Sequence, residues 1–345
     1  MFSGNTHKQT RRAHFARITA GVFLFALVVL LILAMRGTFP FWRAGPLESL
    51  RVGAFVGDVG ALAWIAQDHG FYEQMGLSVD LKGYNTGSES VNALRADQVD
   101  LATASEFVVA ARSFAEPDLR VLASICQYWN KGLIGRRDHG LNYPIDLKGK
   151  RIGVTATSTA EHTLVVFLAL QGLTLKDVQA VPLAPTELVE QITKGTIDAA
   201  MTWQPHVEKI EHQLGNNAVS LMKAGSDAYL LMLTRSDVLS GKATAIEKYL
   251  RALLMAEDWV RANPELAKQY LLTRFALKPA YLDKLWPKMR LVVNLPQEIL
   301  EMMDGEARWL AKRNGQATIP DFTLTVQRAP LSAVKPVAVT LFGLN

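Results

Sequence analysis

The stretch from Lys150 to His162, KRIGVTATSTAEH, combines residue types that can hold a small anion. It predicts a short buried strand at 151–154, a hydroxyl-rich turn, and a helix whose apolar spacing runs over 161–171. The first N–H groups of a helix have no intrahelical acceptor, and the helix dipole adds partial positive charge there. Such a helix start binds anions without Lys or Arg, although an ordinary N-cap would use the same residues. The ligand-binding residues predicted in this turn are Thr157, Ser158, Thr159 and Ala160.

Carboxylates stand where predicted strands end. Glu106 follows a strand that ends at Ser105, and Asp58 follows the run LRVGAFV. Each could hold an amine group of a ligand, and each could instead be a helix-start carboxylate that the dipole favours. Asp227 could reach the same ligand or only solvate a turn. If Glu106 binds, the ligand bears an amine.

Aromatic and hydroxyl side chains complete the set of candidate ligand residues. Trp203 ends a predicted strand beside Pro205, where a planar indole can stack on a flat ligand or pack beneath a loop. Trp129 ends the predicted strand RVLASICQYW, where an aromatic wall of a ligand site is common. Thr86 and Ser105 lie at further strand ends, and residues of these types are equally typical of ordinary turns.

These candidates are positioned by alternating predicted strands and helices from Leu50 onward. The order indicates an α/β fold in which a mostly parallel sheet is covered by helices on both faces. Ligands bind such sheets beyond the carboxyl ends of the strands, where the candidates lie. After Ser236 the pattern changes to longer helices, predicted at 244–263, 264–275 and 295–314.

Composition excludes several classes of function. Six of the 37 basic residues lie within residues 1–47, which hold no Asp or Glu, and the rest of the 345-residue chain has 31 basic and 32 acidic residues. The basic character belongs to the N-terminus, which argues against a nucleic-acid partner. The single cysteine, Cys126, and the scattered histidines give no metal-ligand spacing. Phosphate-loop, dinucleotide-binding and nucleophile-elbow motifs are absent from the sequence, so we expect no cofactor, no metal and no enzymatic activity.

The N-terminal segment predicts a membrane anchor. The uncharged run Ile18–Met35 is just long enough to span a bilayer as a helix. Basic residues precede it and keep the N-terminus in the cytoplasm, so the body would lie on the periplasmic side of the inner membrane. Cleavage as a signal peptide, which would leave the body free in the periplasm, is the alternative.

Several motifs in one order resemble a family of transport proteins. They are LKGKRIGVT, the hydroxyl turn with EH, LAPTELVEQITKGTIDAAMTWQPH, RVGAFVGDVGALAWIAQDHGFYEQMGLSVDL, NTGSESVNALRADQVDLATAS and RAPLSAVKPVAV. The chain from about Leu50 to Val339 is similar to the periplasmic substrate-binding proteins of nitrate, sulfonate and taurine ABC transporters. That group also includes binders of thiamine-pyrimidine precursors. One departure is Ala156, because the family usually has a glycine before the Thr of the turn.

The resemblance implies a two-lobed type II periplasmic-binding-protein fold with the ligand in the cleft between the lobes. Residues 1–47 would form the basic arm, anchor helix and tether, 48–133 the first part of lobe 1, 134–233 lobe 2, and 234–345 the helical return to lobe 1. The implied function is delivery of a small organic anion or zwitterion, or a pyrimidine, to an ABC permease in the inner membrane. A membrane-anchored ligand-sensing or accessory protein that uses the same cleft is the alternative.

Overall fold

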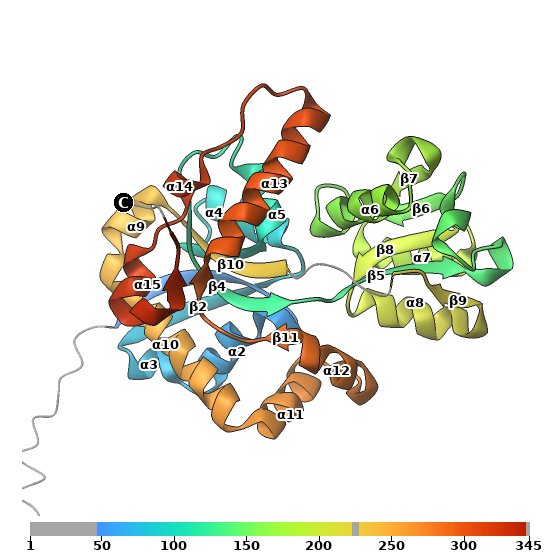
Figure 1. Cartoon of the computed structure of the whole chain (residues 1–345). Helices are drawn as coiled ribbons and strands as arrows, with labels where there is room; N and C mark the ends of the chain where they lie inside the picture. Colours follow the sequence, from blue (N-terminus) through green and yellow to red (C-terminus); the bar gives the residue numbers. More distant parts are fainter. Residues whose placement is uncertain (1–46, 223–227, 343–345) are drawn as a thin grey trace, which may run out of the picture. The chain divides into compact units, whose positions relative to one another are not determined.

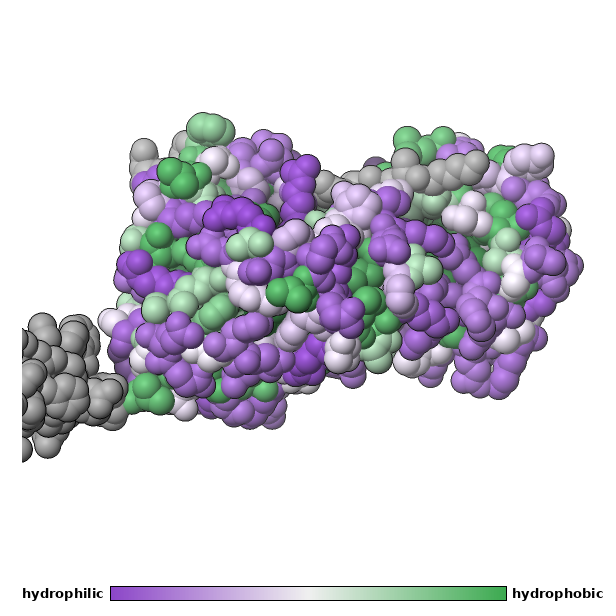
Figure 2. Space-filling model, turned by 90° about the horizontal axis from the view of Figure 1, so that it is seen from below, coloured by the Kyte–Doolittle hydropathy of each residue, from purple (hydrophilic) through white to green (hydrophobic). Residues whose placement is uncertain are grey.

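The computed structural model describes residues 47–222 and 228–342. The predicted arm, apolar span and tether up to residue 46, and the predicted ligand residue Asp227, lie outside these ranges. Within the described ranges, no helix is both long and apolar enough to cross a membrane. Figure 2 shows that hydrophilic residues dominate one face of this body, with hydrophobic residues in small scattered groups.

Two β-sheets organise the described chain, and each carries its own helices (Figure 1). The first sheet has the strand order β11 (Met289–Arg290), β4 (Leu119–Tyr128), β10 (Ala228–Arg235), β3 (Leu101–Ser105), β1 (Glu48–Phe55), β2 (Leu77–Tyr84). The second has the order β7 (Gln179–Pro182), β6 (Arg151–Val154), β8 (Ala199–Trp203), β5 (Lys131–Arg136), β9 (Ala218–Ser220). A short parallel pair joins β12 (Leu295–Pro296) to β13 (Val339–Thr340).

Helices follow the strands as the sequence pattern predicts, and the three long C-terminal helices are confirmed as α10, α11 and α13. The helices that accompany the first sheet are α2 (Ala61–Asp68), α3 (Phe71–Gln74), α4 (Gly87–Arg95), α5 (Glu106–Arg112), α9 (Ser236–Gly241), α10 (Ala243–Ala262), α11 (Pro264–Arg274), α12 (Pro279–Leu285), α13 (Gln297–Asn314), α14 (Phe322–Thr325) and α15 (Ala329–Val334). Those of the second sheet are α6 (Thr159–Leu170), α7 (Pro185–Lys194) and α8 (His206–Leu214).

Strand direction differs from the predicted mostly parallel arrangement. β1 is parallel to β2 and β3, and β6 is parallel to β7 and β8. However, β10 runs antiparallel to β3 and β4, and β5 runs antiparallel to β8 and β9. The chain enters β5 straight from β4 across Trp129 and Asn130, so no crossover helix brings it parallel to its neighbours. Both sheets are therefore mixed.

Neighbouring side chains of the second sheet enter two separate apolar cores. Leu133 packs with Leu164 of α6, whereas Ile134 packs with Ile192 of α7 and Ile210 of α8. Successive side chains of a strand point to opposite faces of the sheet, so both faces must be apolar where helices cover both. Figure 1 shows α6 and α8 on opposite sides of this sheet.

The predicted lobe boundaries at 133/134 and 233/234 fall inside β5 and β10. All of β5 pairs within the second sheet, and all of β10 pairs within the first. The division into lobes stays a prediction. Sheet membership favours a change of lobe just before Lys131 and another between Met222 and Ala228.

One Arg–Asp pair fixes the start of the parallel strands in each sheet. Asp100 accepts hydrogen bonds from the Arg51 backbone N–H at 2.8 Å and from the Arg51 guanidinium at 2.7 Å, and its own N–H donates to the Arg51 carbonyl at 2.7 Å. Arg151 and Asp198 repeat these three bonds at 2.8, 2.7 and 2.8 Å. The two pairs therefore hold β1 in register with β3, and β6 in register with β8.

We predict that Asp100→Asn lowers the free energy of unfolding by about 3 kcal/mol at pH 7, because it removes the buried carboxylate that pairs with the Arg51 and Lys242 side chains. Burial raises the pKa of Asp100, but hydrogen bonds from Arg51 and Lys242 outweigh this effect and bring that pKa to about 2. A lowered pKa contributes stability above the unfolded value of about 4, and this stability is lost as the pH falls toward 2. Denaturant titrations at pH 7 and pH 3 measure both effects.

The matched control is Asp283→Asn, the same change at an exposed position of α12. It should leave the free energy of unfolding within about 0.5 kcal/mol of the wild type. Equal stability of D100N and D283N at pH 7 would contradict the role assigned to Asp100.

Candidate functional site

A cavity of about 180 Å³ lies where the carboxyl ends of strands from both sheets meet. Phe55 ends β1, Ser105 ends β3 and Trp203 ends β8, which is where ligands bind open α/β sheets. The residues that line the cavity are Phe55, Val59, Thr86, Gly87, Ser88, Ser105, Val108, Tyr128, Asn130, Thr155, Ala156, Thr157, Ser158, Thr159, Trp203 and Leu230. We call this cavity the cleft.

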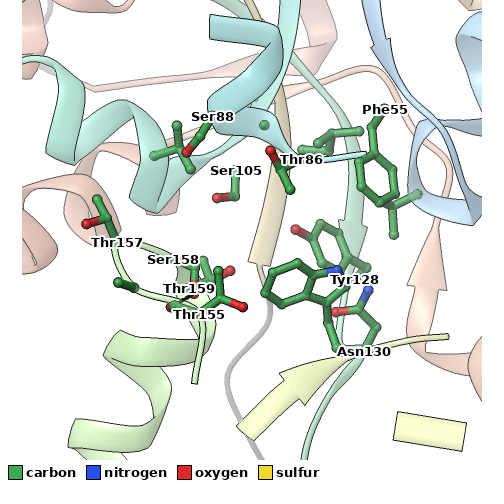
Figure 3. Close-up of a pocket in the computed structure, with 16 residues that line it drawn as sticks. Phe55, Thr86, Ser88, Ser105, Tyr128, Asn130, Thr155, Thr157, Ser158 and Thr159 are labelled. Carbon is green, nitrogen blue, oxygen red and sulfur yellow. Dashed lines mark hydrogen bonds between the residues drawn. The ribbon is translucent and has the colours of Figure 1, made fainter. Parts of the chain in front are cut away.

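Hydroxyl groups from both sheets meet at one end of the cleft (Figure 3). Ser88 and Ser105 come from the first sheet and its helices, and the turn Thr155–Thr159 comes from the second. Phe55 and Tyr128 lie at the other end. The cleft therefore offers hydroxyl groups to one part of a ligand and aromatic surface to another.

None of the described residues that line the cleft has a charged side chain. An ionic ligand must then be held by hydroxyls, the Asn130 amide and backbone groups. Hydroxyls and N–H groups at a helix start can satisfy the oxygens of an anion without a counter-ion. The cleft is therefore suited to an anionic group with a single negative charge rather than to one with several.

The start of α6 shows both the predicted N-cap and the predicted donors. Ser158 caps the helix, since its Oγ accepts the Glu161 N–H at 3.3 Å and donates to the Thr155 carbonyl at 2.6 Å. Glu161 Oε2 accepts the Thr157 N–H at 2.8 Å. In the first turn of the helix, the N–H groups of Thr159 and Ala160 have no intrahelical acceptor. Capping thus uses part of the donor set and leaves part of it for a ligand.

The Glu161 carboxylate would repel an anion at this helix start, but a cation faces it. Arg313 Nη1 lies 2.8 Å from Glu161 Oε1. The ion pair offsets the charge of Glu161, so the partial positive charge of the helix start is retained. Because Arg313 lies on α13 and Glu161 on α6, the pair also joins the helices of the two sheets.

The opposite wall of the cleft is positioned by the start of α4. Thr86 Oγ1 accepts the Glu89 N–H, and Glu89 Oε2 accepts the Thr86 N–H, both at 3.2 Å. This capping box fixes the entry of the chain into the helix. A Cβ at Gly87 would lie 2.8 Å from the Ala104 Cα, so glycine lets α4 approach β3 closely enough to bring Ser88 to the cleft.

Six of the predicted ligand residues line the cleft: Thr86, Ser105, Thr157, Ser158, Thr159 and Trp203. Ala160 is close in sequence but packs its methyl group in the core of the second sheet. Asp58 is buried, and its carboxylate accepts hydrogen bonds from the Tyr281 hydroxyl and the Val59 N–H. Burial raises the pKa of Asp58. Neither residue lines the cleft.

Trp129 and Glu106 lie beside neighbouring cavities instead. The Trp129 ring is covered by Lys288, whose Nζ lies 3.9 Å from the ring centroid. Glu106 is buried and accepts the Tyr229 N–H at 2.8 Å. Our proposals for the cleft therefore do not use the side chains of Asp58, Glu106, Trp129 or Ala160 as ligand contacts, although the Ala160 N–H stays among the donors at the start of α6.

Sequence reasoning missed most of the apolar lining. Phe55 ends β1 and Tyr128 ends β4, so the rule that identified Ser105 also applies to them. The sequence pattern predicts a core position for Val59, Val108 and Leu230. No feature of the local sequence distinguishes these cleft residues from core residues. The other lining residues outside the predicted set are Gly87, Ser88, Asn130, Thr155 and Ala156.

Residues 61–267 match the protein family described as NMT1/THI5 like. The match covers more than half of the chain. The chain belongs to this family. The resemblance read from the sequence motifs is thereby confirmed.

The chain is similar to proteins that are named as binding proteins. A binding protein of Brucella abortus is 28% identical over 219 residues, which cover 58% of this chain and 63% of the relative. The taurine-binding periplasmic protein of Escherichia coli is 24% identical over 208 residues, which cover 59% and 64%. The chain thus spans less than two thirds of the length of these curated relatives.

A solved structure shows the same fold. The alkanesulfonate-binding protein SsuA from Xanthomonas axonopodis pv. citri, bound to MOPS, superposes with a TM-score of 0.69 at 18% identity, covering 81% of this chain and 98% of that one. The α/β periplasmic-binding-protein fold predicted from the sequence is therefore confirmed.

Thr157 gives this family member an unusual turn. Its φ is 50°, in the left-handed region that β-branched residues rarely adopt. We predict that Thr157→Gly raises the free energy of unfolding by about 1 kcal/mol, because glycine adopts this conformation without a steric penalty. Denaturant unfolding of the variant measures the change.

Thr159→Gly is the matched control, since it removes the same side chain at a helical position of α6. It should lower the free energy of unfolding by about 0.5 to 1 kcal/mol. If T157G is destabilised as much as T159G, strain at Thr157 is not significant.

Proposed function

We propose that the protein is a periplasmic solute-binding protein that delivers a small organosulfonate of the taurine type to an ABC importer. The observation that carries the proposal is the uncharged cleft, whose hydroxyl end lies at the start of α6. The chemistry is recognition, in which the ligand favours a closed arrangement of the lobes. The proposed function involves no covalent reaction of the ligand.

A sulfonate matches the hydroxyl end of the cleft. It carries a single negative charge spread over three oxygens, and each oxygen accepts hydrogen bonds. Donors are available from the Thr157 hydroxyl and from the N–H groups at the start of α6, whereas the Thr155 hydroxyl already donates to the Leu183 carbonyl at 3.0 Å. Similar proteins support this assignment, because one is named for taurine and another is an alkanesulfonate-binding protein.

The apolar end of the cleft favours a ligand with an organic body. Phe55, Tyr128 and Trp203 present aromatic surface that an alkyl or aryl group can cover. Nitrate fits the donors but would leave this surface uncovered. Organic sulfonates are therefore preferred to nitrate.

Asn130 adds a requirement for a hydrogen-bond donor. It is buried, and its Oδ1 has no hydrogen-bond partner among the described residues. A buried acceptor without a donor costs about 1 to 3 kcal/mol. An N–H group on the ligand would remove that cost, which favours taurine over an unsubstituted alkanesulfonate.

The proposal includes an ABC permease as partner and a location on the periplasmic side of the inner membrane. The apolar run Ile18–Met35 would anchor the body there, or be removed as a signal peptide. We do not propose an enzymatic activity. Burial raises the pKa of the Cys126 thiol, and so suppresses the thiolate that a cysteine nucleophile would need.

Calorimetric titration of the full chain should show binding of taurine, weaker binding of ethanesulfonate and none of nitrate. The amine of taurine can donate to Asn130, and ethanesulfonate lacks that donor. Aminopyrimidine in the same panel represents the thiamine-precursor branch. Binding of aminopyrimidine with no heat from either sulfonate would overturn the sulfonate assignment.

Trp203→Ala and Thr157→Ala should each weaken taurine binding about tenfold, which corresponds to about 1.4 kcal/mol. The first removes aromatic surface from the cleft, and the second removes a hydroxyl from its donor end. Trp286→Ala and Thr193→Ala are matched controls outside the cleft. Unchanged affinity in both cleft variants would show that taurine binds elsewhere.

A further inference from the structure

A second cavity, of about 640 Å³, adjoins the cleft. Thr159 lines both cavities. The adjacent residues Ser105 and Glu106 line different ones, since Ser105 lines the cleft and Glu106 lines the second cavity. The residues that line it are Glu106, Gln127, Lys131, Thr159, His162, Thr163, Tyr229, Glu298, Glu301, Met302, Gly305 and Glu306. We call it the acidic cavity.

The charges of the acidic cavity do not balance. Its described lining includes the four carboxyl groups of Glu106, Glu298, Glu301 and Glu306, whereas Lys131 is the one Lys or Arg among those lining residues. His162 adds no charge near neutral pH, because burial and the nearby Lys131 lower its pKa to about 4. A cationic ligand would therefore be attracted to this cavity.

Glu306 gives the acidic cavity a specific docking point. The residue is 4% exposed, its Oε1 lies 3.8 Å from His162 Nδ1, and its Oε2 has no hydrogen-bond partner among the described residues. A buried carboxylate oxygen without a donor is costly. Glu106 lies close enough to repel the ionised form of Glu306, whereas Lys131 attracts the ionised forms of both residues. Burial raises the pKa of both carboxyl groups. A donor with positive charge would satisfy Oε2 and relieve the repulsion.

One face of α13 shapes the rest of the cavity. Glu298, Glu301, Met302, Gly305 and Glu306 follow helical spacing and all line it. Glu298 and Glu301 are exposed and Glu306 is buried, so the cavity runs from an open rim to a closed end. Met302 offers apolar surface between them. A Cβ at Gly305 would meet no atom within 4 Å, which marks open space on this face.

We propose that the acidic cavity binds a primary alkylammonium ion. Its N–H groups would donate to Glu306 Oε2 and to Glu106, and its alkyl chain would lie along Met302 toward the rim. A metal ion is not favoured, because no group of three His, Cys, Asp or Glu residues in the described chain is placed to hold one. The proposal goes beyond sulfonate binding, since it concerns a separate cavity and a ligand of opposite charge.

Titration of n-butylammonium chloride into the full chain, followed by calorimetry, tests the proposal. The wild type should bind, and Glu306→Gln should bind at least tenfold more weakly because it removes the charge and keeps the shape. Glu190→Gln is the matched control, with the same charge change on an exposed residue of α7. It should bind as the wild type does.

Gly305→Leu provides a second test that does not depend on replacing a buried carboxylate. Leucine is a better helix former than glycine, so the variant should fold, and its side chain should fill the open space and block binding. No binding by the wild type, or equal affinity in E306Q, G305L and the wild type, would overturn the proposal.

The sulfonate proposal and the acidic-cavity proposal can each be refuted without refuting the other. n-Butylammonium has no anionic group, so Trp203→Ala and Thr157→Ala should leave its binding unchanged. Taurine binding without n-butylammonium binding would refute the acidic-cavity proposal alone. n-Butylammonium binding without sulfonate binding would refute the sulfonate assignment alone.

Discussion

The arrangement of both cavities depends on one Arg–Asp pair in each sheet, in which the Asp is buried. Arg51 of β1 pairs with Asp100, the residue before β3, and Arg151 of β6 pairs with Asp198, the residue before β8. Each pair joins neighbouring parallel strands through backbone and side chain together. The sequence carries the pair as R-x-G followed later by D-x-A in each half of the chain. A slip of one residue would turn every side chain of a strand to the other face. By fixing the start of β3, Asp100 therefore determines what lies at its carboxyl end, about 17 Å away.

Binding in the cleft is linked to the arrangement of the two sheets. Thr155 and Trp203 come from the second sheet, while Phe55 and Ser105 come from the first, so the cleft is complete when both are in place. The contact beside it is built from several kinds of interaction. Phe107 stacks on His162 with ring centroids 5.5 Å apart, and His162 meets Trp309 edge-on at 5.4 Å. Together with the pair Glu161–Arg313, these contacts hold α6 beside α5 and α13.

Much of the fold could be predicted because periodicity is a local property. The spacing of apolar residues located α10, α11 and α13 to within a few residues, and strand ends located Ser105, Trp203 and the hydroxyl turn. The antiparallel course of β5 and β10 could not be predicted, since it depends on where the chain passes between sheets. The direction of a side chain just after a strand is also set by tertiary contacts. Asp58 turns to Tyr281, which is distant in sequence, and so leaves the cleft.

Ser105 and Glu106 show why adjacent candidates need not share a site. Ser105 ends β3 and Glu106 begins α5, so their side chains enter different cavities. In the sequence, both residues lie at the end of one predicted strand. The acidic cavity could not be predicted, because Glu306 lies on α13, which is distant from Glu106 in the sequence. The separation has an electrostatic consequence. An uncharged cleft can hold an anion while the carboxylates beyond that backbone step hold a cation. Because the two cavities share Thr159, the two bound charges would attract across a partly buried region, so each bound ion would favour the other, and by linkage the effect is reciprocal.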